Sequence, residues 1–252
     1  MRYDLIKRIQ RLFTIIGLIS FFGIVILATR DADFAFSSSR GAGWMPQLFS
    51  RPQIALISGH AGSDSGAICT DAAGQTTLTE AAITAAVSAK TATLLQQRGY
   101  AVTILNEFDE RLNGLQAVAL LSLHADSCVD LSGYKAAYSE TSAIPETDAR
   151  LTGCIAQYYA TETGLHEHPE TITHNMTEYH AFRKIDPATP AAILELGFLG
   201  GDQELLTAQQ DRLAQGVADS LDCFLSTPST STPSTSTPST STPSTSTTPT
   251  SK

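Results

Sequence analysis

The chain has 252 residues, and its 25 aspartates and glutamates outnumber its 16 lysines and arginines, which gives a formal net charge of -9. This length leaves room for one domain of the usual size, about 100–200 residues, together with appendages. The acidic charge argues against a protein that binds nucleic acid, because phosphates require a basic face.

The N-terminal region has the pattern of a membrane anchor. Residues 12–28 (LFTIIGLISFFGIVILA) are uncharged and almost entirely apolar, at the short limit for a spanning helix of about 17–25 residues. Basic side chains precede this segment and acidic ones follow it, namely Arg2, Lys7, Arg8 and Arg11, then Asp31 and Asp33. This asymmetry places the N-terminus inside the cell. We predict a single-pass signal anchor in the cytoplasmic membrane, with residues 1–11 in the cytoplasm; cleavage of the anchor would instead make the protein secreted.

Two further segments are expected to lie outside the folded domain. Residues 29–52 are polar and contain serine and glycine, as is typical of a linker. Residues 226–252 repeat Ser-Thr-Pro-Ser-Thr and have no aliphatic or aromatic side chain to bury, so we predict a disordered tail. This tail is an extended spacer, an O-glycosylated stalk or only a solubilising segment. The folded domain is then expected over residues 53–225, on the outer face of the membrane.

Within this domain, apolar runs of strand length alternate with segments of helix length. Strands are expected at 54–58, 101–105, 117–123, 134–138, 179–184 and 191–196, and helices at 80–98, 146–162 and 202–225. Gly99 and Gly164 stand where the first two helices should end. The alternation predicts a single α/β domain with a mostly parallel or mixed twisted sheet flanked by helices.

Three of the apolar runs end in a potential metal ligand or acid. His60 and His124 follow strand-like runs, and Glu195 lies within one. Strand ends converge in open α/β sheets, and Glu80, at the start of the first long helix, can direct its carboxylate to the same edge. Two histidines and a carboxylate form a catalytic zinc set with a fourth position open for water. Taken singly, each residue also has a plainer explanation as a turn or helix-dipole residue, but a carboxylate in an apolar strand is a candidate general base.

Four motifs in this chain, in order and spacing, resemble the Amidase_3 family of N-acetylmuramoyl-L-alanine amidases. They are GHAGSDSGA (59–67), TEAAI (79–83), SLHAD (122–126) and PAAILELGF (190–198). Together they span nearly all of the expected domain, and the set is much more specific than any one motif. The resemblance implies zinc held by His60, Glu80 and His124, with Glu195 as the catalytic residue.

The activity that the resemblance implies is hydrolysis of the amide between N-acetylmuramic acid and L-alanine in peptidoglycan, in cell-wall turnover or remodelling. Glu195 would take a proton from the attacking water and pass it to the leaving amine. Peptidoglycan lies outside the membrane, where the predicted anchor places the domain. We expect a monomer whose partners are peptidoglycan and the membrane.

The chain departs from the family pattern in two places. The family usually has Asp-Pro before its Gly-His and a glycine where Ala61 stands, and residues 111–116 are shorter than the corresponding Arg-to-Ala-Asn stretch.

Two other functions stay open: a zinc peptidase acting on another envelope peptide, and a catalytically silent module that binds the cell wall. The intact set of four residues argues against silence, because a pure binder needs no carboxylate in that strand.

Other residues have two interpretations each. Arg183 is a candidate substrate-binding residue for a stem-peptide carboxylate, which arginine can bind through two parallel hydrogen bonds, or it forms a surface ion pair. Asp64 and Asp126 either orient the histidines of the zinc set or stabilise turns. Four further histidines are additional ligands or solvated loop residues, namely His166, His168, His174 and His180.

The four cysteines would lie on the oxidising side of the membrane, where disulfides form. They allow three pairings. Cys69 and Cys128 each follow a ligand loop by a few residues, so we favour this pair, which leaves Cys154 and Cys223 to join two helices. No C-x-x-C motif is present, so we do not expect cysteine to bind the zinc.

Overall fold

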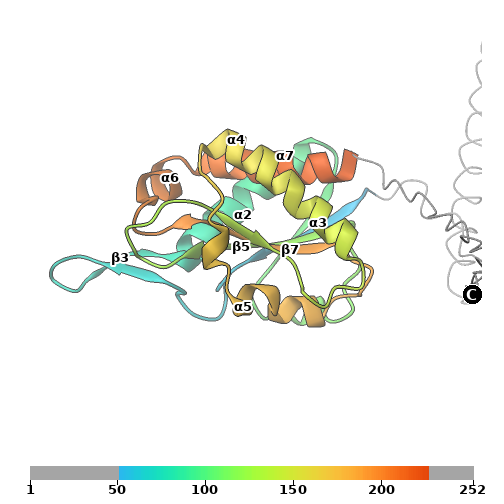
Figure 1. The fold of residues 1–252 in the computed structure, drawn as a ribbon, viewed down its shortest axis with the longest axis horizontal. Coiled ribbons are helices and arrows are strands. Elements are labelled where there is room, and N and C mark those ends of the chain that lie inside the picture. Colours follow the sequence, from blue (N-terminus) through green and yellow to red (C-terminus); the bar gives the residue numbers. More distant parts are fainter. Residues whose placement is uncertain (1–50, 227–252) are drawn as a thin grey trace, which may run out of the picture. The chain divides into compact units, whose positions relative to one another are not determined.

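The computed structural model describes residues 51–226, and Figure 1 shows their fold. The predicted cytoplasmic segment, the predicted anchor, almost all of the linker and the tail beyond Ser226 lie outside the described residues. Within residues 51–226, no helix is both long and apolar enough to cross a membrane. The boundaries of the N-terminal segments and of the tail therefore stay predictions.

A five-stranded mixed sheet forms the centre of the domain, with strand order β4-β1-β5-β7-β6. The strands are β1 (Gln53–Ser58), β4 (Ala101–Leu105), β5 (Ala119–Asp126), β6 (Lys135–Ala137) and β7 (Ala191–Phe198). Strands β4, β1, β5 and β7 run parallel to one another, whereas β6 is antiparallel to β7. Both faces of the sheet are covered, which explains why the parallel strands are continuous apolar runs. The predicted α/β class and mixed sheet are confirmed.

Helices cover both faces of this sheet (Figure 1). One face bears α2 (Glu80–Gln97), α3 (Pro145–Cys154), the π-helical segment η3 (Ile155–Tyr159), α4 (Ala160–Thr163), α6 (Gln203–Ala208) and α7 (Gln210–Ser226). The other face bears α5 (His174–Thr177) and the 3-10 helix η5 (His180–Arg183). Side chains of β1 alternate between the two cores: Leu56 packs with the first group of helices, and Ile57 packs with Met176 and Ala181.

Several elements differ from the sequence prediction. The strand expected at 179–184 is wrong, because this segment forms η5, whose backbone is satisfied locally by hydrogen bonds such as Lys184 N to Ala181 O (2.9 Å). The helix expected at 202–225 is divided at Gln209 into α6 and α7. Five short elements were not predicted: the hairpin of β2 (Ile68–Thr70) and β3 (Thr76–Thr79), the helix α5, and the 3-10 helices η2 (Glu110–Leu112) and η4 (Pro169–Thr171).

Two disulfides connect elements that are distant in sequence. Cys69 pairs with Cys128, and Cys154 pairs with Cys223, as favoured from the sequence. The first joins the β2–β3 hairpin to the loop after β5, and the second joins α3 to α7. Bonds that close loops of this length typically stabilise a fold by about 2–4 kcal/mol. The first bond also connects the segment between His60 and Glu80 to the loop that follows His124, so it links the parts of the chain that carry the predicted zinc ligands.

Candidate metal centre

His60 lies just beyond the carboxyl end of β1, in a turn that passes close to β5 and requires a positive φ at His60. Gly59 precedes it, and a Cβ atom on Gly59 would lie 2.6 Å from Cε1 of His124 and 2.6 Å from the carbonyl oxygen of Leu123. Glycine at this position therefore lets the turn pass close beside β5. His60 itself has φ 64° and is the only non-glycine residue with positive φ among residues 51–226. Its imidazole is directed toward the start of α2.

Glu80 is the first residue of α2, and its carboxylate is fixed by backbone donors. Thr79 caps the helix by accepting a hydrogen bond from Ala82 N, which sets where the helix begins. Glu80 Oε2 accepts from Ala67 N (2.9 Å), and Oε1 accepts from Ala125 N (3.1 Å). Glu80 is buried, with 5% of its surface exposed. The two hydrogen bonds hold its carboxylate at the edge of the sheet where β1 and β5 end.

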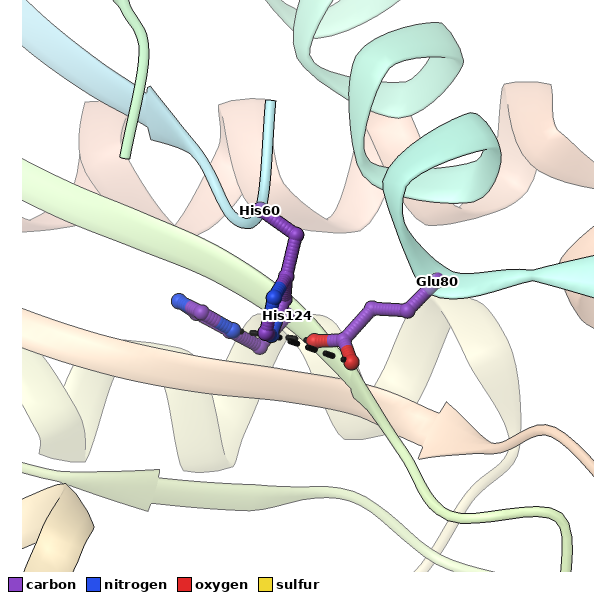
Figure 2. A group of neighbouring side chains, drawn as sticks. All are labelled: His60, Glu80 and His124. Atoms are coloured by element: carbon purple, nitrogen blue, oxygen red, sulfur yellow. Dashed lines mark hydrogen bonds and ion pairs between the residues drawn. The ribbon is translucent and has the colours of Figure 1, made fainter. Parts of the chain in front are cut away.

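The structure brings His60, Glu80 and His124 together (Figure 2), as the sequence predicted. One donor atom from each lies within 4.8 Å of the other two. His60 Nε2 is 3.3 Å from Glu80 Oε2, and His124 Nδ1 is 2.9 Å from Glu80 Oε1. No other group of three such donors occurs in the described part of the chain. Two imidazole nitrogens and one carboxylate oxygen match the donors of catalytic zinc sites, so the residues fit the ion that the motifs imply.

Asp64 contacts His60 on the side away from Glu80. Its Oδ1 lies 2.5 Å from His60 Nδ1 and also accepts a hydrogen bond from Gly66 N (2.8 Å). Asp64 therefore both stabilises the turn and orients the histidine, which are the two roles considered for it. The bond from Gly66, followed by that from His60, lowers the pKa of Asp64. Asp126 instead pairs with Lys135, so the structure gives it no contact with a histidine of the group.

Glu195 lies on β7 directly beside His124 of β5 in the register of the sheet. The residue keeps a partly exposed surface, but its Oε2 is buried and has no hydrogen-bond partner. Burial raises the pKa of Glu195 to about 7, against an opposing effect of the positive charge on His124. A carboxyl group that titrates near neutrality can both accept and donate a proton. Its catalytic role stays a prediction that this position favours.

The raised pKa of Glu195 predicts a pH-dependent stability. Its carboxyl group ionises at about 7 in the folded protein and at the ordinary 4.5 in the unfolded chain, so the fold loses stability as the pH rises between these values. After a discount for its partial exposure, the loss is about 2 kcal/mol. Chemical denaturation with chelator present should therefore show that Glu195→Gln is more stable relative to the unmodified chain at pH 8 than at pH 4. A difference that does not change with pH would contradict this result.

Glu107 is a residue of the site that sequence reasoning missed. It lies two residues beyond β4, and its carboxylate is buried. Its Oε2 accepts a hydrogen bond from His60 N (2.9 Å) and lies 3.6 Å from His124 Nε2. Burial raises the pKa of Glu107, but the hydrogen bond from His180 and the charge of His124 lower it more, to about 2. A signal was present in the sequence, because Glu107 follows the end of a third parallel strand.

A family model described as N-acetylmuramoyl-L-alanine amidase, Amidase_3, matches residues 54–223, which is most of the chain. The chain belongs to this amidase family. The family's activity is hydrolysis of the amide between N-acetylmuramic acid and L-alanine in peptidoglycan, and the chain is an amidase of this type. No curated protein sequence matches it.

Solved structures share the fold of this amidase at low sequence identity. The CwlD amidase of Clostridioides difficile, in complex with the GerS lipoprotein, is 19% identical with a TM-score of 0.56, over 69% of this chain and 98% of that one. The amidase Ami1 of Mycobacterium smegmatis is 15% identical with a TM-score of 0.54, over 70% and 97%. The catalytic domain of CwlV from Bacillus (Paenibacillus) polymyxa is 21% identical with a TM-score of 0.50, over 69% and 98%. At these identities the likeness shows the fold alone.

The remaining predicted residues of the amidase lie outside the group of three. Arg183 is on η5, is exposed, and donates to the carboxylate (3.1 Å) and carbonyl (2.8 Å) of Glu178, which is the ion-pair interpretation; its binding of substrate stays a prediction. His180 donates to Glu107 (2.8 Å), and His168 bonds to Thr171 (2.9 Å). None of the four loop histidines joins a three-donor group within residues 51–226.

Proposed function

We propose that this amidase is zinc-dependent, with His60, Glu80 and His124 as the zinc ligands and Glu195 as the acid–base residue. One observation carries the proposal: two imidazoles and a carboxylate converge at one sheet edge, with donor atoms within 4.8 Å of one another. Beside them on the next strand stands a glutamate whose pKa is raised to about 7, chiefly by burial. Protein sites for hydrolytic zinc use this donor set and keep a further position open.

The chain's own residues divide the chemistry between binding and proton transfer. Zinc, when bound, polarises the amide carbonyl and lowers the pKa of water. Glu195 accepts a proton from the attacking water as a new C–O bond forms at the lactyl carbonyl. It then delivers that proton to the amine nitrogen as the C–N bond breaks, which leaves a carboxylate on the sugar and a free L-alanine amine. A pKa near 7 suits both transfers, because the group is then a sufficient base and a sufficient acid.

We also propose that the amidase acts as a monomer on the outer face of the cytoplasmic membrane, held there by residues 12–28. The charge asymmetry around that segment supports this topology. The two disulfides agree with an oxidising compartment. The substrate is extracytoplasmic as well, so the anchor and the activity require the same location.

Incubation of the purified full-length chain with peptidoglycan and zinc, followed by mass analysis of the products, tests the proposed reaction. We expect free stem peptides that begin with L-alanine, and no release when a chelator is present. Cleavage within the stem peptide would indicate the peptidase alternative. Binding to the sacculus without any release would indicate a silent module, and release that persists in chelator would contradict zinc dependence.

A further inference from the structure

The buried carboxylate of Glu107 contacts both histidines of the proposed zinc set but does not belong to it. It is 5% exposed, and it extends from the turn after β4 into the space behind the group. A buried ionised group is costly unless its interactions offset that cost. Each contact of the Glu107 carboxylate leads either to a histidine of the set or to a residue that holds the carboxylate in place.

The first contact fixes the backbone of His60. A positive φ is unfavourable for a residue that carries a Cβ atom and persists only where its surroundings enforce it. His60 N donates to Glu107 Oε2 at 2.9 Å, and Glu107 N donates to the carbonyl oxygen of Ala61 at 3.1 Å. These two hydrogen bonds tie the turn after β1 to the turn after β4. The carbonyl of His60 also accepts hydrogen bonds from Ser63 N (3.0 Å) and Asp64 N (3.2 Å), and the bond to Glu107 is the one that holds its amide.

The second contact acts on the ring of His124. Its Nδ1 faces Glu80 Oε1 at 2.9 Å, and its Nε2 faces the hydroxyl of Tyr179 at 3.5 Å and Glu107 Oε2 at 3.6 Å. A neutral imidazole carries one N–H, and the other nitrogen offers its lone pair to a metal. Glu80 Oε1 by itself draws a proton to Nδ1, but Glu80 is one of the three donors. With zinc bound by Glu80, the negative charge of Glu107 behind Nε2 would favour the N–H on that nitrogen and leave the lone pair of Nδ1 to the metal.

Glu107 is itself held by residues of the segment that precedes β7. Its Oε1 accepts hydrogen bonds from the Tyr179 hydroxyl (2.9 Å) and from His180 Nε2 (2.8 Å). Ser122 of β5 in turn donates to the Tyr179 hydroxyl (3.0 Å). The Tyr179 and His180 rings pack against each other, with centroids 4.4 Å apart. The carboxylate therefore has one oxygen committed to its supports and the other directed at the histidines.

We propose that Glu107, held by Tyr179 and His180, is a positioning residue that fixes the turn of His60 and the tautomer of His124 and thereby sets the zinc affinity of the centre. The inference rests on the proposed zinc site and adds a residue that determines how tightly this site binds its metal. Partners of this kind, which hold a ligand in orientation, typically change metal affinity about 10- to 100-fold when they are removed.

The test is the zinc affinity of the full-length chain and its variants, measured in detergent by competition with a chromophoric chelator. Glu107→Gln keeps the size of the side chain and removes its charge, and we expect zinc to bind about 10- to 100-fold more weakly. Tyr179→Phe removes one hydroxyl, and we expect a loss of roughly 3- to 10-fold, the range for one hydrogen bond. In both variants the visible spectrum of the cobalt(II)-substituted protein should change, because it reports ligand geometry.

A matched control is available in Asp148, which is another buried carboxylate outside the site. It is 4% exposed and accepts hydrogen bonds from Ser142 Oγ (2.5 Å) and Ala191 N (2.9 Å). Asp148→Asn should lower thermal stability and leave zinc affinity and the cobalt spectrum unchanged. Equal zinc loss in Asp148→Asn and Glu107→Gln would overturn the inference, because the effect would then be general destabilisation.

Two further outcomes separate this inference from the function on which it rests. If His60→Ala loses zinc while Glu107→Gln and Tyr179→Phe bind it normally, the zinc site is correct and the positioning role is wrong. If His60→Ala also binds zinc normally, the proposed ligand set itself is wrong, and the positioning role is overturned with it. Tyr179→Phe decides the matter alone should Glu107→Gln not fold, since an unchanged affinity in that variant contradicts the network.

Discussion

Replacement of Glu195 by glutamine should reduce the turnover of peptidoglycan by about 100- to 10,000-fold, the usual contribution of general acid–base catalysis. The amide of glutamine can neither take the proton of the attacking water nor return it to the leaving amine. Because Glu195 is not one of the three converging donors, the variant should still bind zinc as tightly as the unmodified chain. The measurement is the rate of stem-peptide release at saturating zinc, with the metal content determined on the same sample.

The zinc content makes this experiment decisive about the role of Glu195. An inactive variant that retains its metal identifies Glu195 as the proton-transfer residue. An inactive variant without metal would assign Glu195 to metal binding instead. Activity within a few-fold of the unmodified chain would remove Glu195 from the mechanism, whatever the metal content.

The second large effect is expected from His60→Ala. Loss of one ligand from a protein zinc site removes roughly a quarter of a binding free energy of about 10–16 kcal/mol. This corresponds to roughly 3 kcal/mol, or an affinity at least about 100-fold weaker. His60 suits the experiment because its side chain is 28% exposed, against 8% for that of His124, so its removal leaves little empty space in the core. Chelator competition measures the affinity, and peptide release should fall in parallel.

Loop histidines provide the control for this prediction. His168 bonds to Thr171, and His174 opens the short helix α5; neither is part of the group of three in the described residues. The double variant His168→Ala and His174→Ala should bind zinc normally and stay active. Loss of one equivalent of zinc in this control would restore the interpretation of these histidines as additional ligands.

The parallel part of the sheet could be predicted from the sequence because each strand is a separate apolar run. The run AVTIL at Ala101–Leu105 coincides with β4, and β1, β5 and β7 differ from their predicted bounds only by one to three residues at an end. The three donors could also be predicted, since strand ends converge in such a sheet and the first helix starts beside them. Convergence is a property of the topology, so it requires no knowledge of side-chain packing.

The other part of the site depends on packing that a one-dimensional pattern does not contain. Tyr179 and His180 lie in the segment for which the sequence predicted a strand, but the backbone of this segment bonds to itself, and Tyr179 and His180 are directed inward to Glu107. Glu107 stands among polar residues and resembles a solvated loop acid. Its function depends on contacts with residues 47 and 73 positions away in sequence, and these are visible only in three dimensions.

The order of the strands along the chain has a consequence for when activity can arise during synthesis. The three metal donors come from β1, α2 and β5, so their segments are all complete once residue 126 has been made. Glu195 comes on β7, which enters the sheet between β5 and the short β6, and non-local pairing of this kind forms late. A partly synthesised or partly folded chain can therefore gather ligands but lacks its base. Hydrolysis of the wall becomes possible only when β7 is in place, so activity itself reports that the central sheet is complete.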